Sequence, residues 1–227
     1  MKKILIIEDD PAVVKGITEN LLNEHFDVVS TESGEKGYQL VKKENPDLII
    51  LDLILPDIDG MEICKRLRNE NIRTPIVMVT GKGDDLDRIL GLEIGADDYV
   101  TKPFNVRVLI AQIKAILRRI DNYKSGDIKN YRFGNLEVDF KKMEIVKNGI
   151  QKTLTLMELN VLKYLIERKG EAVSRDDLLN NVWGYDAFPT TRTVDNYILS
   201  LRKKIEDDQK EYKHILTVHK VGYKFVD

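Results

Sequence analysis

Acidic side chains follow two segments of the sequence that read as buried strands. The apolar run 48–51 ends at Asp52, and the run 3–7 ends at Glu8 and Asp9. The carboxyl ends of the strands meet at one edge of a parallel α/β sheet, so we expect these carboxylates to lie together. Crowded carboxylates repel one another unless a cation lies between them, and such oxygen ligands suit Mg²⁺. Taken alone, an acid at a strand end is also an ordinary turn cap.

Two further strand-like segments end in a hydroxyl and an ammonium group. Residues 76–79 precede Thr80, and residues 98–101 precede Lys102. A lysine supplies a point charge for a phosphoryl group, and a threonine hydroxyl can donate a hydrogen bond to it. Because a carboxylate can act as the nucleophile, the four strand ends predict a phosphoryl site in which a carboxylate is the acceptor.

The first half of the chain alternates strands and helices. Five strands and five helices in this order favour a doubly wound parallel sheet. The predicted strands are 3–7, 26–30, 48–51, 76–79 and 98–101, and the predicted helices are 12–24, 33–44, 61–69, 84–94 and 105–120. The polar segment 121–130, with Ser125 and Gly126 at its centre, is predicted to be a flexible linker.

The second half changes in style and predicts an α+β unit over 131–227, with short strands, three helices and a terminal hairpin. Four short strands come first, with Asn148–Gly149 as a hairpin turn, and capping boxes at Thr155 and Ser174 begin two helices. The strands are expected at 131–133, 136–139, 143–147 and 151–154, a third helix at 191–206, and a terminal hairpin at 215–220 and 223–226.

The third helix of this half has one apolar stripe, formed by Val194, Ile198, Leu201 and Ile205. The opposite face combines cations and amides, which can reach phosphates and base edges in a major groove. A solvated amphipathic helix is the plainer alternative, but three helices followed by a hairpin favour DNA binding. The polar face is expected to contain Arg192, Asn196, Leu199, Ser200 and Lys203, flanked by Tyr197, Arg202 and Lys204.

Composition fits two modest domains and excludes several classes of protein. The 227 residues are 42% hydrophobic and 33% charged, and one cysteine, Cys64, excludes an internal disulfide. Neither a membrane span nor a signal peptide is evident, so we expect a cytoplasmic protein with no membrane partner. Residues 1–121 carry 17 basic against 22 acidic residues and residues 122–227 carry 19 against 16, which points weakly to nucleic acid at the basic end.

The first half resembles the receiver domain of two-component response regulators. The resemblance covers residues 1 to about 120 and rests on Glu8-Asp9, Asp52, Thr80 and Lys102-Pro103-Phe104 in that order. It implies a flavodoxin-like sheet with strand order 2-1-3-4-5, in which Asp52 accepts a phosphoryl group from a sensor histidine kinase. It also implies a Mg²⁺ site formed by Asp9, Asp52 and the Ile54 carbonyl, with Glu8 assisting through water. Lys102 would bind phosphoryl oxygens, and Thr80 and Tyr99 would form the switch pair.

The second half resembles the winged-helix effector domain of the OmpR/PhoB class. The stretch 192–205 and the segment Gly222-Tyr223-Lys224-Phe225 carry the resemblance. It implies a recognition helix at 191–205, a wing at 215–226 that reaches the minor groove, and a loop at 184–190 that contacts RNA polymerase. The expected DNA contacts are Arg192, Thr193, Asn196, Tyr197, Leu199, Ser200, Arg202, Lys203, Thr217, His219, Lys220 and Tyr223.

Several positions depart from the family pattern. Leu199 and Ser200 replace basic residues on the reading face, and His219-Lys220 replaces Arg-Gly in the wing. Gly81 replaces the usual alanine beside Thr80, which predicts faster dephosphorylation. At the dimer face used by the family, Arg88, Asp97, Asp98 and Arg119 match, whereas Val108 and Gln112 do not. Exposed ion pairs contribute at most about 1 kcal/mol each, so a homodimer on activation is weakened or repacked rather than excluded.

These features predict a phosphorylation-controlled DNA-binding transcriptional regulator, and not an enzyme beyond its own phosphotransfer and dephosphorylation. One alternative is a constitutive DNA-binding regulator, which the altered dimer face keeps open. Another is an aspartyl-phosphate phosphatase of the haloacid dehalogenase type. That class needs a second acid two residues after the nucleophile, where this chain has Ile54.

Overall fold

The chain divides into two compact units, Met1–Ile120 and Asp121–Asp227. The computed structural model describes residues 1–81, 95–125, 130–183, 191–208 and 210–227, with the side chains of 122–125, 191 and 192 excluded. Each unit has its own hydrophobic core and is described separately. The predicted helix at 84–94 lies outside the described residues.

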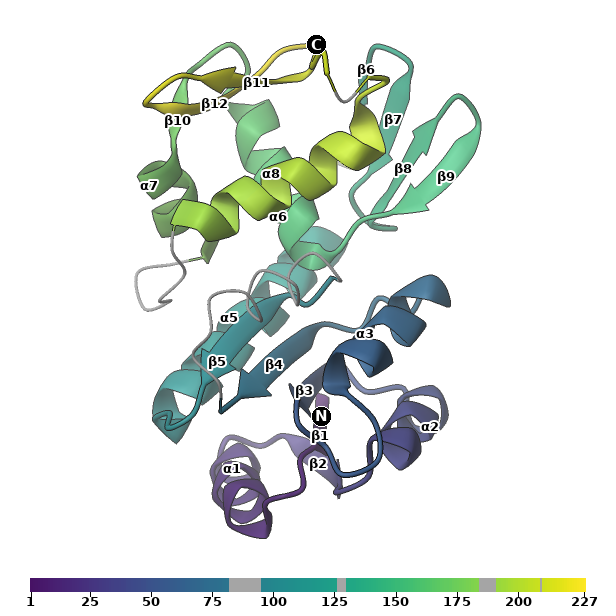
Figure 1. The fold of residues 1–227 in the computed structure, drawn as a ribbon, viewed down its shortest axis with the longest axis vertical. Helices are drawn as coiled ribbons and strands as arrows, with labels where there is room; N and C mark the ends of the chain where they lie inside the picture. The colour runs from purple at the N-terminus through teal and green to yellow at the C-terminus, as the bar shows by residue number, and fades with distance from the viewer. Residues whose placement is uncertain (82–94, 126–129, 184–190, 209) are drawn as a thin grey trace. The chain divides into compact units, whose positions relative to one another are not determined.

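A five-stranded parallel sheet forms the centre of the first unit (Figure 1). Its order is β2-β1-β3-β4-β5, so the predicted doubly wound sheet is confirmed. Every residue of β3 and β4 is buried, because helices cover the sheet on both faces. The strands are β1 Lys3–Ile7, β2 Asp27–Thr31, β3 Leu48–Asp52, β4 Ile76–Thr80 and β5 Asp98–Thr101.

The helices of the first unit begin at polar caps. The side chains of Asp10, Ser33 and Asp59 accept hydrogen bonds from the first backbone N–H groups of the helices that follow them. Such caps satisfy N–H groups that have no partner inside the helix. The helices are α1 Pro11–Asn23, α2 Gly34–Glu44, α3 Gly60–Asn69 and α5 Val106–Ser125.

Helix α5 is longer than predicted. It continues through the first half of the segment that the sequence indicated as a linker and ends at Ser125. Residues 121–125 are polar but include neither glycine nor proline, the two residues that most strongly disfavour a helix. The prediction of a flexible segment starting at residue 121 is therefore wrong for those five residues.

The second unit contains two antiparallel sheets around three helices (Figure 1). A four-stranded sheet pairs in the order β6-β7-β8-β9, and a three-stranded sheet pairs β10-β12-β11. Its strands are β6 Asn130–Phe133, β7 Leu136–Asp139, β8 Glu144–Lys147, β9 Ile150–Thr153, β10 Val173–Ser174, β11 Ile215–Val218 and β12 Gly222–Phe225.

The helices of this unit begin as predicted, with capping boxes at Thr155 and Ser174. The second of them differs from the expected regular helix, because α7 lasts only four residues and continues as a π-helical turn, η1. The bounds are α6 Leu156–Glu167, α7 Arg175–Leu178, η1 Leu179–Trp183 and α8 Thr191–Ile205. Helix α8 packs across α6 (Figure 1).

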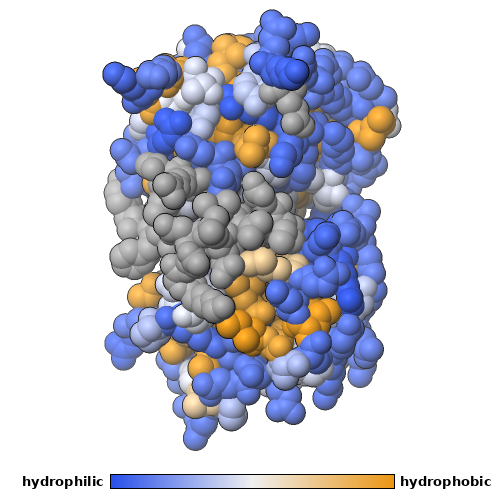
Figure 2. All heavy atoms as spheres, viewed as in Figure 1, coloured by the Kyte–Doolittle hydropathy of each residue, from blue (hydrophilic) through white to orange (hydrophobic). Residues whose placement is uncertain are grey.

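The surface is largely hydrophilic on the face drawn in Figure 2, in keeping with a chain of which one third is charged. Among the described residues, no helix is both long enough and apolar enough to cross a membrane.

Candidate phosphoryl site and nucleic-acid interface

Three carboxylates meet at the carboxyl edge of the parallel sheet. Strands β1 and β3 are neighbours with Ile7 opposite Leu51, so the residues that follow them emerge side by side. Glu8, Asp9 and Asp52 each place a carboxylate oxygen within 4.8 Å of the others. Glu8 and Asp52 are buried, whereas Asp9 is exposed. The structure thus brings together the acids that the strand-end pattern indicated.

Lys102 joins the two buried acids. Its Nζ lies 2.7 Å from Glu8 Oε1 and 2.6 Å from Asp52 Oδ2. Burial raises the pKa of Glu8 to about 7, and the neighbouring Asp52 adds to this, although Lys102 opposes it. Burial opposes the charge of Lys102 itself, but the bonds to Asp52 and Glu8 raise its pKa. Lys102 therefore offsets only part of the cost of burying Glu8, whose pKa stays raised.

The donor set of this pocket fits Mg²⁺. Glu8 Oε2 is buried and has no hydrogen-bond partner in the described part of the chain, although such an oxygen is costly to bury alone. With Asp9 and Asp52 it offers hard oxygen ligands of the kind that hold a partly hydrated Mg²⁺. The backbone N–H of Ile54 donates to Asp52 Oδ1 at 3.0 Å, which holds the chain after β3 close to the acceptor. Receiver domains bind Mg²⁺ at an acidic pocket of this kind, formed here by Glu8, Asp9 and Asp52.

A cleft of about 560 Å³ opens beside the acids, between α1 and the loop that follows β2. It gives solvent a route to the carboxylates. Its lining includes Glu8, Asp9, Thr18, Thr31, Ser33 and Lys36.

Thr80 and Tyr99 lie on the neighbouring strands β4 and β5 and are buried. Asp52 is paired with Val79, and the N–H of Lys102 donates to the carbonyl of Thr80 at 2.7 Å. This register brings the predicted switch threonine to the same edge as the acceptor. Among the described residues, a methyl group added at Gly81 would meet no atom within 4 Å.

Sequence reasoning missed the residue that anchors the acceptor loop. Asp57 accepts hydrogen bonds from Ser33 Oγ at 2.7 Å, from the N–H of Gly34 at 2.9 Å and from the N–H of Glu35 at 3.1 Å. These bonds, Ser33 first, lower the pKa of Asp57 to about 2. The loop between β3 and α3 is thereby fixed to the beginning of α2. The sequence signal for this role was the aspartate after Pro56, because an aspartate side chain can accept hydrogen bonds from the N–H groups at the start of a helix.

Gly60 closes the same loop. A Cβ atom there would lie 2.1 Å from the carbonyl oxygen of Asp52, which is closer than atoms can approach. The N–H of Gly60 also donates to the carbonyl of Leu53 at 3.0 Å. Only a residue without a side chain allows α3 to start this close to the acceptor strand.

The dimer residues predicted from the family pattern separate into two groups. Asp97 is 1% exposed and forms an ion pair with Arg68 at 3.0 Å, while also accepting the N–H of Ile76 at 3.0 Å. Because its carboxylate is used inside the protomer, the prediction of Asp97 as an interface residue is wrong. Arg88 lies outside the described residues, and the partly exposed ones are Asp98, Val108, Gln112 and Arg119.

The core stripe of α8 is confirmed, because Val194, Ile198, Leu201 and Ile205 are all buried. Of the twelve expected DNA contacts, Leu199, Lys203, Thr217, His219 and Lys220 are exposed. Thr193, Asn196 and Ser200 are partly buried, and the side chain of Arg192 lies outside the described residues.

Three expected DNA contacts are instead part of the interior. Tyr197, Arg202 and Tyr223 are 2%, 7% and 4% exposed. Tyr197 packs on Trp183 with ring centroids 5.4 Å apart, and the hydroxyl of Tyr223 donates to Asp195 at 2.6 Å. Their assignment to the DNA surface is therefore wrong. The helical spacing held a signal for Tyr197, which is three residues after Val194 and four before Leu201.

Two family models match the chain. Residues 4–114 match the response regulator receiver domain, and residues 149–225 match the C-terminal domain of transcriptional regulatory proteins. The alkaline phosphatase synthesis transcriptional regulatory protein PhoP of Bacillus subtilis is 41% identical over 230 residues, which cover 98% of this chain and 96% of PhoP. The transcriptional regulatory protein AfsQ1 of Streptomyces coelicolor is 42% identical over 224 residues, which cover 99% and 98%.

Solved structures agree with these matches. A mutant of RitR superposes with a TM-score of 0.81 at 27% identity, covering 99% of each chain. The response regulator DrrB of Thermotoga maritima, described as an OmpR/PhoB homologue, gives a TM-score of 0.53 at 34% identity over the full length of both chains.

An acidic pocket on a doubly wound sheet, joined to a winged-helix unit, defines a two-component transcriptional regulator. The chain belongs to the response regulator family, in its OmpR/PhoB class. It is a regulator of transcription with a DNA-binding domain, so DNA and a sensor kinase are its partners, and control by phosphorylation is typical of the family. Its relatives are transcriptional regulators and not classical enzymes.

Proposed function

We propose that Asp52 is the phosphoryl acceptor and that Mg²⁺ binds to Asp9, Asp52 and the Ile54 carbonyl, with Glu8 in support. The observation that carries this proposal is the bridge from Lys102 to both Glu8 and Asp52, at 2.7 and 2.6 Å. A buried carboxylate beside an ammonium group has a nucleophile and a phosphate-binding charge in one place.

In the transfer step, an Asp52 carboxylate oxygen attacks the phosphorus of a phosphohistidine on the kinase. The P–O bond to Asp52 forms as the P–N bond breaks, and the released imidazole of the kinase takes up a proton. Mg²⁺ at this site would neutralise charge on the phosphoryl oxygens. Lys102 exchanges its bond to Asp52 for one to a phosphoryl oxygen, which keeps its charge paired throughout. Hydrolysis by water returns the carboxylate and inorganic phosphate.

Phosphorylation adds a charge of about −2, and side chains on the neighbouring strands β4 and β5 respond to it. Thr80 donates to the phosphoryl group, and Tyr99, which is already buried on the neighbouring strand β5, packs against the rearranged threonine. We infer that this biases a dimer face that includes Asp98, Val108, Gln112 and Arg119. A dimer presents two α8 helices to half-sites spaced by about one turn of DNA. The segment 184–190 is the proposed contact for RNA polymerase, and a cytoplasmic location is part of the proposal.

Sedimentation of the full chain tests the phosphorylation switch without an operator. Wild type and Asp52→Ala are compared in Mg²⁺, with and without beryllofluoride, which mimics a phosphoryl group. We expect a dimer only for wild type with beryllofluoride. A dimer in every sample would support a constitutive regulator instead.

The constitutive alternative has one specific observation in its favour. Asp97, an acid of the family's dimer pattern, is already paired with Arg68 inside the protomer. If neither protein dimerises in solution, sedimentation is repeated with duplex DNA. A beryllofluoride-dependent dimer on DNA, absent in Asp52→Ala, would still favour the switch.

A further inference from the structure

Three consecutive cations close helix α8, and their surroundings differ sharply. Arg202 is buried, Lys204 is partly buried and Lys203 is exposed. In the sequence they form one basic cluster at the end of the recognition helix. Only a cation that is free of internal partners can neutralise a DNA phosphate without breaking a bond inside the protein.

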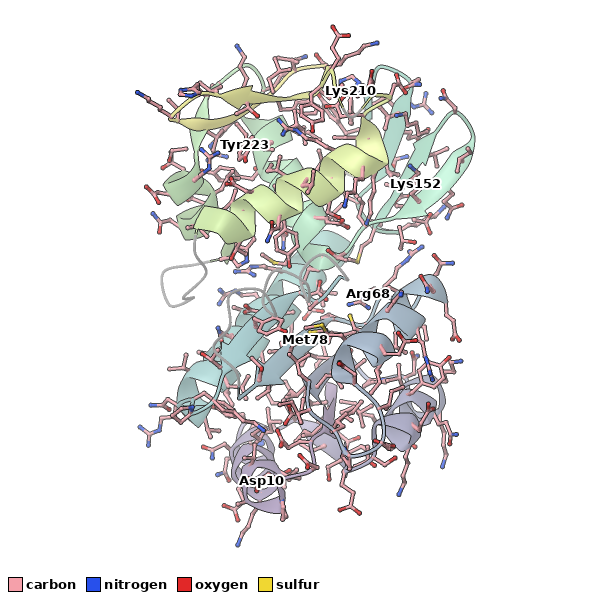
Figure 3. All side chains as sticks on the ribbon, viewed as in Figure 1. Asp10, Arg68, Met78, Lys152, Lys210 and Tyr223 are labelled. Atoms are coloured by element: carbon pink, nitrogen blue, oxygen red, sulfur yellow. The ribbon has the colours of Figure 1, made fainter. Side chains whose placement is uncertain are left out.

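Arg202 is committed to the wing. Its Nε and Nη2 donate to the carbonyl of Ile215 at 3.0 and 2.7 Å, and Nη2 also donates to Thr217 Oγ1 at 2.8 Å. The guanidinium lies 3.7 Å from the ring centroid of Tyr212 and 5.5 Å from that of Tyr223. Burial lowers its pKa, which is the expected cost of enclosing a cation. These contacts fasten α8 to β11 and to β12, the strand that carries Tyr223 (Figure 3).

Lys204 is committed to the opposite side of α8. Its Nζ lies 2.5 Å from Glu158 Oε2 and 2.9 Å from the carbonyl of Thr153. Glu158, at 2% exposure, also accepts Ser200 Oγ at 2.6 Å and the N–H of Thr155 at 2.7 Å. Ser200 and Lys204 are four residues apart and so lie on the same face of the helix. One buried carboxylate at the start of α6 thus holds two points of α8.

In the described part of the chain, the side chain of Lys203 is hydrogen-bonded neither to the wing nor to α6. No hydrogen bond or ion pair of its ammonium group is found among the described residues, and its side chain is exposed. Its backbone carbonyl accepts a hydrogen bond from Nζ of Lys152 at 3.4 Å, and Lys152 lies on the strand β9 beside the end of α8 (Figure 3).

We propose that Lys203 is the DNA-contacting cation of this cluster, and that Arg202, Lys204 and Ser200 are positioning residues that orient α8 between the wing and α6. Ser200 is thereby removed from the predicted DNA contacts. The inference rests on the proposed role of α8 as the recognition helix and says which of its charges reach the phosphates.

Salt dependence separates the two roles. Each phosphate contact contributes a slope of about −0.9 to log Kobs against log salt on duplex DNA. Binding of the full chain to a labelled duplex of unselected sequence is measured by fluorescence anisotropy over a range of salt. We expect Lys203→Met to make the slope less steep by about 0.9. Lys204→Met and Arg202→Gln should leave the slope unchanged, although each removes the same charge.

A second measurement tests whether Ser200 and Lys204 affect the sequence selectivity of DNA binding and not only folding. A duplex selected by the wild type from a random pool is compared with its scrambled sequence, well below the unfolding temperature of each variant. We expect Lys204→Met and Ser200→Ala to lose selectivity severalfold, and Lys203→Met to weaken binding to both duplexes alike. Ser200→Ala changes no charge and keeps the test open if Lys204→Met does not fold.

Two results would overturn the inference. One is a slope that falls as much for Lys204→Met as for Lys203→Met. The other is full selectivity in folded Ser200→Ala and Lys204→Met. If Lys203→Met changes neither slope nor affinity while an α8 variant at Leu199 also has no effect, the assignment of α8 as the recognition helix fails instead.

Discussion

Gly81 follows the buried residue Thr80, and no described residue has an atom within 4 Å of a methyl group added at Gly81. We expect Gly81→Ala to fold normally and to lengthen the half-life of the phosphorylated protein severalfold, because the methyl group shields the phosphoryl group from water. Release of phosphate after labelling by acetyl phosphate measures the half-life. An unchanged half-life in the folded variant would show that Gly81 does not control access.

At the residue scale, strand ends were the reliable signal and surface charge was the unreliable one. Glu8, Asp52 and Lys102 could be predicted because parallel strands bring their carboxyl ends to one edge. Arg202 and Asp97 could not, because both are charged residues that the fold encloses with partners from distant segments. A single sequence gives the charge of such residues, but it does not show which carbonyl and amide groups surround them in the folded protein.

Arg68, near the end of α3, connects that helix to the residues just before β5 (Figure 3). Besides the ion pair with Asp97, it donates to the carbonyls of Gly95, Ile72 and Thr74 at 2.9, 2.7 and 3.0 Å. Removing one partner of a buried pair leaves the other charge without compensation.

We therefore expect Arg68→Ala to lower the free energy of unfolding of the receiver by about 3 kcal/mol or more, measured by urea denaturation. Arg66→Ala is the control on the same helix. Its side chain is 40% exposed and pairs with Glu35 and Glu62, so its loss should cost about 1 kcal/mol or less. Equal losses for the two variants would show that burial of Asp97 does not set the cost.

The carboxylate of Asp57 connects the loop between β3 and α3 to the beginning of α2. The pKa of Asp57 is about 2 in the folded protein, below the usual value of 3.8. At a pH between these two values, the unfolded chain binds a proton at Asp57 that the folded protein does not bind. The stabilisation is therefore complete above the unfolded pKa and is lost as the pH falls toward the folded one. We expect Asp57→Asn to be less stable than wild type by a constant difference from pH 7 to pH 5.

That difference should shrink as the pH falls below 4. Urea midpoints of both proteins across this range measure it, and the comparison cancels the titration of the other acids. A difference that stays the same down to pH 3 would mean that the hydrogen bonds of Asp57 do not depend on its ionisation.

Elements with strong periodicity were predictable within a residue or two, and the exceptions have physical causes. Helix α5 passed through a polar segment because residues 121–125 contain neither glycine nor proline, the residues that most strongly disfavour a helix. Strand β10 is two residues long and exists through its pairing with β12, which no local pattern reveals. The π-helical turn after α7 likewise depends on packing and not on the sequence period.

At the scale of the whole molecule, the division into two units has a thermal consequence. Each unit has its own core, so we expect two unfolding transitions in calorimetry. Mg²⁺ with beryllofluoride should raise only the receiver transition, by about 10 °C if the ligand exceeds its dissociation constant a hundredfold. Asp52→Ala should abolish this shift, and an equal shift of both transitions would show that the units unfold together.

The extension of α5 to Ser125 also sets a limit on spacing. Only residues 126–129 separate it from Asn130, the first residue of β6. Such a segment reaches at most about 18 Å when fully extended. In the proposed dimer, Asn130 of each DNA-binding unit can therefore lie at most about 18 Å from Ser125, the last residue of its α5 helix. The range of operator spacings that the regulator tolerates is then bounded by a length of backbone, and residues inserted after Gly126 would widen it.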